Sequence, residues 1–256
     1  MNRNILQAGV LLATTGLLQA ASLSFDFEAQ DLAATTSGSG FSVTDLAETG
    51  LGSNSIYGDF TTTTMVRAYV PGQITNGSSP AFDAADYVQF GLTAGADGIN
   101  FSGSSFSTTV GGFTSAGSGG AMGIFVNVYY SLDGGANWSS ALGSTLSINQ
   151  AAYTNPGNAS GEFGFDGALG FDESHASDSY DLSSLGTLAS GEEVLFRIAI
   201  NDNSGSNVNL TSGNNVKGVY LDDITVSDFT ASAVPEPGTS TLLLSCGALA
   251  LLRRRR

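Results

Sequence analysis

Two groups of acidic residues could do chemistry in this chain. The first group stands at the two ends of the central region, with Asp26 and Glu28 near its start and Asp222 and Asp223 near its end. Hard cations such as Ca²⁺ are bound by about six to eight oxygen ligands at ~2.3–2.6 Å, which carboxylates and backbone carbonyls supply. These four residues are therefore candidate ligands for a structural calcium ion. The alternative is a set of solvated carboxylates on an acidic protein.

The second group lies between Asp166 and Asp181, in a region from Asn149 to Tyr180 that the sequence predicts to be a long irregular loop. Here carboxylates alternate with aromatic residues, and the chain's single histidine, His175, stands among them. Carboxylate pairs ~5–9.5 Å apart carry out acid/base catalysis in glycoside hydrolases, and aromatic rings can stack on sugars. The competing interpretation, which we favour, is an acidic loop whose aromatic side chains enter the core. No Gly-x-Ser-x-Gly motif accompanies His175 to suggest a serine nucleophile.

The charge of the central region excludes one class of function. Residues 21–233 keep three basic residues, Arg67, Arg197 and Lys217, and 22 of the chain's 23 acidic residues, for a net charge near −19. Such a surface repels nucleic acid and anionic polymers unless divalent cations intervene. The only cysteine, Cys246, lies near the C-terminus, so residues 21–233 cannot form a disulfide among themselves.

Short alternating apolar runs separated by Gly, Ser, Asn and Asp predict an all-β domain for residues 21–233, an antiparallel β-sandwich. The clearest run is Met122 to Leu132, in which Ile124, Val126 and Val128 alternate with polar and aromatic residues over a period of two. A second clear strand is predicted over Val194 to Ile200.

Two local motifs refine the strand pattern. In the last predicted strand the apolar alternation slips by one residue between Leu221 and Ile224, which predicts a β-bulge at Asp222-Asp223. The stretch from Ser131 to Trp138 matches the Ser-x-Asp-x-Gly-x-Asn-Trp pattern of the Asp-box, a hairpin turn in which Asp caps backbone N–H groups and Gly adopts positive φ. The motif occurs once, so we interpret it as structural rather than catalytic.

The first and last predicted strands resemble those of a known fold. Phe25-Asp26-Phe27-Glu28 and the run from Val219 to Val226 resemble the terminal strands of jelly-roll domains of the galactose-binding and carbohydrate-binding-module kind. The resemblance implies that these strands lie side by side, which would bring Asp26 or Glu28 near Asp222 or Asp223. It also implies a structural calcium there and an association with sugars.

The N-terminus predicts export. Arg3 supplies a positive charge, residues 5–18 form an apolar stretch, and Leu18-Gln19-Ala20 precedes an acceptable cleavage site before Ala21. This is the pattern of a secretory signal peptide over residues 1–20, a helical segment delivered to the Sec translocase. The alternative, an ordinary buried helix, does not account for the terminal charge.

The C-terminus has three parts in order. They are Val234-Pro235-Glu236-Pro237, an apolar stretch over residues 238–252, and four arginines, Arg253 to Arg256. As a transmembrane helix, the apolar stretch is ~22 Å long at ~1.5 Å per residue, shorter than the ~30 Å hydrocarbon core. The tail resembles the PEP-CTERM sorting signal, which implies transient anchoring in the inner membrane and processing near residues 234–237 by the membrane protease exosortase. The alternative is a plain C-terminal membrane anchor.

The sequence thus predicts a signal peptide, one jelly-roll β-sandwich over residues 21–233 and a sorting tail over 234–256. The expected function is that of a non-catalytic protein of the cell surface or extracellular matrix, associating with polysaccharide. The alternatives are a secreted glycoside hydrolase or lyase of jelly-roll fold, and a purely structural matrix or adhesion protein.

Overall fold

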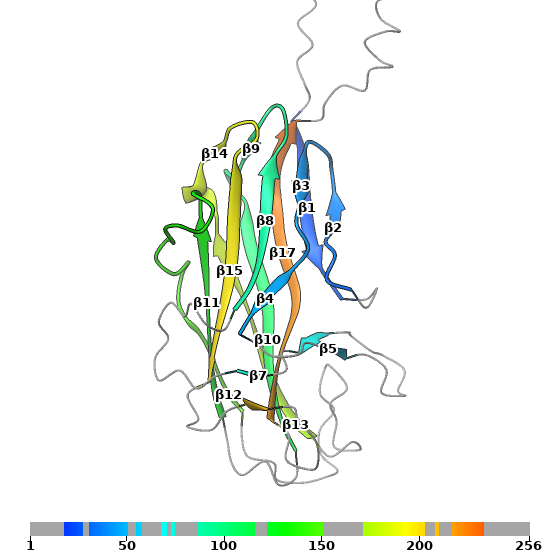
Figure 1. Cartoon of the computed structure of the whole chain (residues 1–256), viewed down its shortest axis with the longest axis vertical. Helices are drawn as coiled ribbons and strands as arrows, with labels where there is room; N and C mark the ends of the chain where they lie inside the picture. Colours follow the sequence, from blue (N-terminus) through cyan, green and yellow to red (C-terminus); the bar gives the residue numbers. More distant parts are fainter. Residues whose placement is uncertain are drawn as a thin grey trace, which may run out of the picture.

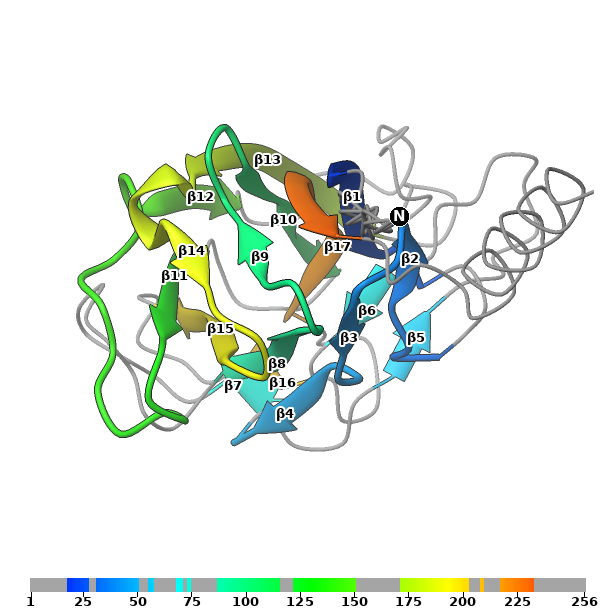
Figure 2. The ribbon, with the colours of Figure 1, turned by 90° about the horizontal axis from the view of Figure 1, so that it is seen from above.

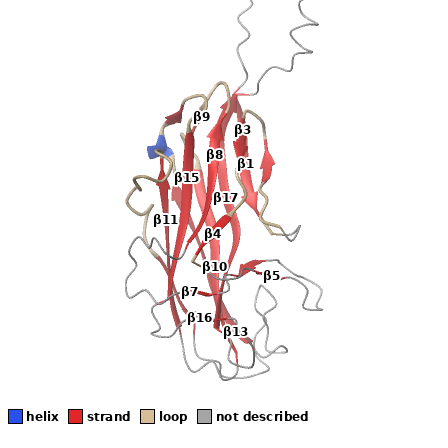
Figure 3. Ribbon diagram, viewed as in Figure 1, coloured by secondary structure: helices blue, strands red, loops and turns tan. Residues whose placement is uncertain are grey.

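The computed structural model shows an elongated molecule built almost entirely of strands (Figure 1 and Figure 3). It describes residues 18–27, 31–50, 55–57, 68–70, 73–74, 87–115, 122–150, 171–202, 208–209 and 217–232. Glu28 and the predicted sorting tail lie outside these residues, as do residues 1–17 of the predicted signal peptide. Among the described residues, no helix is long and apolar enough to cross a membrane.

Two antiparallel sheets form the sandwich, as the sequence predicts. The principal strands of sheet A are, in spatial order, β13 (Phe171–Asp181), β10 (Ser105–Ser115), β17 (Lys217–Ser232), β1 (Leu18–Phe25) and β2 (Thr35–Ser37). Its other strands are β5 (Ser55–Tyr57), β6 (Ala68–Val70), β9 (Ile99–Asn100) and β14 (Thr187–Leu188).

Sheet B faces sheet A, as the view from above shows (Figure 2). Its strands are, in order, β12 (Leu146–Gln150), β11 (Met122–Ser131), β15 (Glu193–Asp202), β8 (Tyr87–Ala94) and β3 (Phe41–Val43), with β4 (Ala47–Thr49) also paired to β8. A separate pair, β7 (Gln73–Ile74) and β16 (Val208–Asn209), and a short 3₁₀ helix, η1 (Ser183–Leu185), complete the described elements.

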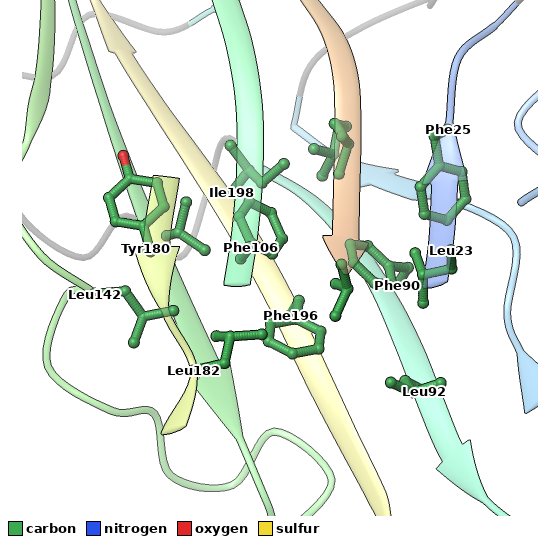
Figure 4. Close-up of a cluster of buried hydrophobic side chains, with 14 of the residues drawn as sticks. Leu23, Phe25, Phe90, Leu92, Phe106, Leu142, Tyr180, Leu182, Phe196 and Ile198 are labelled. Carbon is green, nitrogen blue, oxygen red and sulfur yellow. The ribbon is translucent and has the colours of Figure 1, made fainter. Parts of the chain in front are cut away.

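Aromatic side chains from both sheets meet in the core (Figure 4). Phe90 of sheet B lies 4.9 Å from Phe25 and 6.3 Å from Phe106 of sheet A, measured between ring centroids. Phe196 of sheet B lies 5.6 Å from Phe106. These separations fall in the range of favourable aromatic pairs, ~4.5–7 Å, so the rings hold the two layers together.

The first and last strands pair, as the resemblance to jelly-roll domains implies. The register runs from Leu18 opposite Ser232 to Phe25 opposite Ile224. Strand β1 therefore begins inside the predicted signal peptide, and cleavage after Ala20 would remove its first three residues. The two ends of the described chain consequently lie next to each other at one end of the sandwich.

The predicted β-bulge is confirmed. On β10 two steps separate Ser107 from Thr109, whereas on β17 three steps separate their partners Thr225 and Asp222. The extra residue is Asp223, which adopts φ +48°. A second bulge, which we did not predict, occurs where Ala21 and Leu23 oppose Phe229 and Val226, and Asp228 there adopts φ +59°.

The predicted irregular region from Asn149 to Tyr180 is wrong over its last part. Residues Phe171–Asp181 form β13, which pairs with β10 along its whole length. The prediction failed because the segment is rich in Asp and Ser, with few of the β-branched and aromatic residues that favour strands. It forms a strand because β10 offers a continuous ladder of backbone partners beside it.

The bulge predicts how β17 tolerates substitution. Asp tolerates the left-handed region better than β-branched residues, and Gly tolerates it best. We expect Asp223→Val to lower the free energy of unfolding by ~1–2 kcal/mol relative to Asp223→Gly, as measured by denaturant titration of the full chain. Asp223→Asn, which keeps the size and the backbone preference, is the control. Equal stabilities of the Val and Gly variants would contradict the assignment.

Candidate functional site

The outer face of sheet B gathers side chains that can bind a polar ligand. The pairing register places Tyr129 of β11, Arg197 of β15 and Gln89 of β8 in one row across the sheet. Period-two alternation turns these side chains away from the core, because their neighbours along each strand are the buried residues of the sandwich. We call Tyr87, Gln89, Tyr129, Trp138 and Arg197 the aromatic face.

Arg197 is the centre of the aromatic face. Its guanidinium carbon lies 3.6 Å from the ring centroid of Tyr87 and 3.9 Å from that of Trp138. Its Nε and Nη2 atoms donate hydrogen bonds to Oε1 of Gln89, at 3.3 and 2.9 Å. Each cation–π contact contributes ~0.5–2 kcal/mol, with the larger values where water is excluded. The two rings, the cation and the amide therefore hold one another in a fixed arrangement.

Burial sets the protonation properties of this face. Arg197 is 8% exposed and Tyr129 4% exposed, whereas Tyr87, Gln89 and Trp138 are half-buried and reach solvent. Burial lowers the pKa of Arg197, and its charge interaction with Tyr87 works in the opposite direction. Burial also raises the pKa of the Tyr129 hydroxyl. Arginine has such a high ordinary pKa that it stays charged, so the face carries a fixed positive charge in a very acidic domain.

The Asp-box turn positions Trp138. Asp133 Oδ1 accepts hydrogen bonds from the Asn137 N–H (2.8 Å) and from the Ser131 hydroxyl (2.7 Å), and Gly134 and Gly135 adopt φ of +70° and +89°. The Trp138 indole N–H donates to the Gly135 carbonyl at 3.1 Å. The predicted structural role of this motif is confirmed: the turn is closed by Asp133 and directs Trp138 onto Arg197.

The four predicted calcium ligands are only partly brought together. Asp26 follows the last paired residue of β1, in line with Asp223 across from it. Asp223 is exposed and Asp222 has no exposed surface, so the two neighbours differ completely in burial. Among the described residues no three metal-binding side chains cluster. Because Glu28 lies outside the described residues, the calcium site stays a prediction.

The acidic residues of the predicted catalytic loop are spread along a strand. The acidic residues from Asp172 to Asp181 belong to β13. This strand is at the edge of sheet A and pairs with β10. Asp181 is exposed, and hydrogen bonds from the Ser183 hydroxyl and from the Ser183 N–H, the latter 2.8 Å from Oδ1, lower its pKa. The backbone bond satisfies the first N–H of η1, which is a structural task. Asp166 lies outside the described residues.

Comparisons with known proteins find weak likenesses of shape. Neither the comparison with protein-family models nor that with curated proteins finds a match. A solved family 27 carbohydrate-binding module of Caldicellulosiruptor saccharolyticus, in complex with mannohexaose, is 15% identical with a TM-score of 0.36, covering 80% of this chain and 95% of that chain. The K3 cleaved adhesin domain of Lys-gingipain from Porphyromonas gingivalis is 14% identical with a TM-score of 0.30, covering 80% and 98%. Scores this low support no function for this chain.

The hydrogen bonds to Asp133 predict a pH dependence. They lower its pKa from 3.8 to about 2, the Asn137 N–H contributing most. The stabilisation is therefore complete above the ordinary pKa and is lost as the pH falls through about 2. We expect the melting temperature of the native chain to exceed that of Asp133→Asn near neutral pH, and the gap to narrow as the pH falls from about 4 to about 2.

Leu132→Ala is the matched control for this measurement, because it alters an exposed residue of the same loop without changing a titratable group. The difference between its melting temperature and that of the native chain should not follow the Asp133 curve. A gap for Asp133→Asn that is constant across the acidic range would contradict the assignment.

Proposed function

We propose that this protein is an exported β-sandwich that binds a neutral polysaccharide, without catalysis, on the aromatic face. The observation that carries the proposal is the arrangement of Tyr87, Trp138 and Gln89 around Arg197 on the outer side of sheet B. Aromatic rings with a solvent-facing part offer an apolar surface for the faces of sugar rings, and Tyr and Trp also carry a polar atom. Half-buried amides and hydroxyls beside them can pair with sugar hydroxyls.

Rigidity of the face supports binding. A flexible side chain loses ~0.5–1.5 kcal/mol when a ligand immobilises it. The guanidinium of Arg197 is already fixed by two rings and by Gln89, and Trp138 is fixed by its bond to Gly135. A sugar chain docking here would therefore meet side chains whose conformations are already restricted.

Charge favours a neutral polymer. Residues 21–233 carry a net charge near −19, which repels uronate-rich or sulfated chains. Arg197 offers little compensation, because it is buried and its guanidinium is engaged with Gln89 and two rings. Neutral hexose or pentose polymers meet no such repulsion.

A catalytic function has less support. Hydrolysis of a glycosidic bond requires two carboxyl groups that face each other across the bond. The acidic residues from Asp172 to Asp181 instead follow one edge strand of sheet A. The enzyme and the purely structural protein are retained as outcomes of the binding test.

The cellular localisation of the protein is a separate part of the proposal. A signal peptide over residues 1–20 would engage the Sec translocase, and a sorting tail over 234–256 would hold the chain briefly in the inner membrane until exosortase acts near Val234 to Pro237. The pairing of Leu18 with Ser232 is compatible with this order of parts, because both terminal segments then join the sandwich at one end. The domain would finally reside at the cell surface or in the extracellular matrix.

Removing one ring should weaken polysaccharide binding. We expect Trp138→Ala to reduce the affinity of the full chain for soluble mannan, xylan or mixed-linked glucan at least tenfold, or ~1.4 kcal/mol, as measured by calorimetry in mild detergent. Leu132→Ala is the matched control, since Leu132 is 52% exposed in the same loop but is not part of the face. Trp138→Phe should retain most of the affinity.

Other outcomes separate the alternatives. Release of reducing sugar from any of these polymers would show an enzyme. Absence of binding by the folded native chain would favour a structural matrix protein, and equal affinities of the native chain and Trp138→Ala would place the site elsewhere.

The sorting proposal predicts a change in processing. With Pro235 and Glu236 both replaced by Ala, the chain should persist at full length in the membrane fraction of a host that carries exosortase. Native protein should there be shortened and released, as seen by mass spectrometry of the C-terminus. Thr239→Ala, outside the motif, is the control. Equal processing of the motif variant and the native chain would contradict the proposal.

A further inference from the structure

A small residue on the outer face of sheet B is surrounded by larger polar side chains. Ala199 of β15 lies opposite Asn127 of β11 on one side and opposite Tyr87 of β8 on the other. Asn201 lies two residues further along β15 on the same face, and Arg197 lies two residues earlier. Ala199 thus shares the outer face with neighbours that carry amide, guanidinium and phenol groups.

Two asparagines beside Ala199 are buried with unused hydrogen-bond donors. Asn127 and Asn201 are each 1% exposed, and the Nδ2 atom of each lacks a hydrogen-bond partner among the residues that the structure describes. Asn127 Oδ1 accepts a hydrogen bond from the Thr145 hydroxyl at 2.7 Å, so the other end of that amide carries the unused N–H groups. A buried donor without an acceptor is strongly unfavourable, and most such groups in proteins are satisfied by protein or by ordered water.

The geometry allows one atom to satisfy both amides. Asn127 lies opposite Ala199, whereas Asn201 lies opposite Phe125, so the two asparagines are diagonal neighbours on adjacent antiparallel strands. Diagonal neighbours are ~7–8 Å apart, and the other two corners of this square are Ala199, whose side chain is a single methyl group, and Phe125. Two short amide side chains can reach across such a gap to the same acceptor, and an ordered internal water needs about two to four polar partners.

We propose that Asn127 and Asn201 bind a single hydrogen-bond acceptor enclosed above Ala199, either an ordered water molecule or a monovalent anion such as chloride. The site is distinct from the polysaccharide-binding site, because both amides are inaccessible to a polymer. The acceptor site is next to the row of Tyr129, Arg197 and Gln89. A bound acceptor would therefore stabilise the side chains of the aromatic face. Binding of the acceptor does not depend on whether the aromatic face binds sugar.

Substituting an asparagine by leucine tests the proposed acceptor, because the sign of the change in melting temperature depends on whether the amide is satisfied. If Asn201 holds an acceptor, Asn201→Leu removes a satisfied bond and lowers the melting temperature of the full chain by about 2–8 °C. If its amide is unsatisfied, the apolar side chain is neutral or stabilising, and the proposal is overturned. Ser104→Ala is the control, because Ser104 Oγ is also buried without a partner among the described residues but lies directly before β10 of sheet A, away from the asparagine pair. The melting temperature of this variant should equal or exceed that of the native chain.

A double-mutant cycle separates a shared acceptor from overpacking. Asn127→Leu and Asn201→Leu should together lower the melting temperature by clearly less than the sum of the single changes, because the first change already releases the acceptor. Strictly additive losses would overturn the shared site.

The source of the acceptor is distinguished by changing the salt. If it is chloride, the gap between native chain and Asn201→Leu widens as chloride replaces isethionate at constant ionic strength; if it is water, the gap is constant. Should the leucine variants fail to fold, a crystal structure of the native chain grown in bromide decides: anomalous density at the two Nδ2 atoms indicates the anion and ordinary density indicates water. No density there would overturn the proposal.

Discussion

Contact between phenylalanine rings of opposite sheets is the interaction on which the rest of the structure depends. Phe90 and Phe196 of sheet B meet Phe25 and Phe106 of sheet A at centroid separations between 4.9 and 6.3 Å. Residues 21–233 hold no cysteine, so burial has to supply the stability that disulfides provide in many exported domains. Each such ring contributes ~1.5–3 kcal/mol when fully buried. It also fixes the register, since a slip of one residue would turn the ring outward.

The aromatic face follows from this constraint. Once Phe90 and Phe196 point inward, alternation turns Gln89 and Arg197 outward, and the register of β11, β15 and β8 aligns them in one row. Burying the charged guanidinium of Arg197 at this position would be unfavourable if it had no partners. Tyr87 and Trp138 cover its two faces and Gln89 accepts its hydrogen bonds, which makes the burial tolerable. The same stacking restricts the conformations of Tyr87 and Trp138.

Local patterns in the sequence were sufficient for the strands and the turn but not for the site. The step from Leu221 to Ile224 predicted the first bulge, and an equal step from Val226 to Phe229 carried the same signal for the second, which we overlooked. Strand β13 was missed because its polar composition hides its pairing with β10. The aromatic face could not be assembled, because it depends on which residue of β8 lies beside which residue of β15, information that no single strand contains. The one signal of the aromatic face in the sequence is that aromatic residues such as Tyr129 stand at positions where a half-buried strand usually carries polar residues.

Backbone geometry explains part of the acidic pattern that suggested a metal. Asp223 and Asp228 are the extra residues of two bulges and adopt φ of +48° and +59°. Aspartate is one of the few non-glycine residue types that enter this region readily, and the extra residue of each bulge adopts it here. A conformational role therefore accounts for aspartate at both positions without a bound cation. It does not extend to Asp222, which does not adopt a positive φ and has no exposed surface. Of the three described residues that suggested calcium, backbone conformation explains Asp223 but neither Asp26 nor Asp222, and Asp222 is the one that is fully buried.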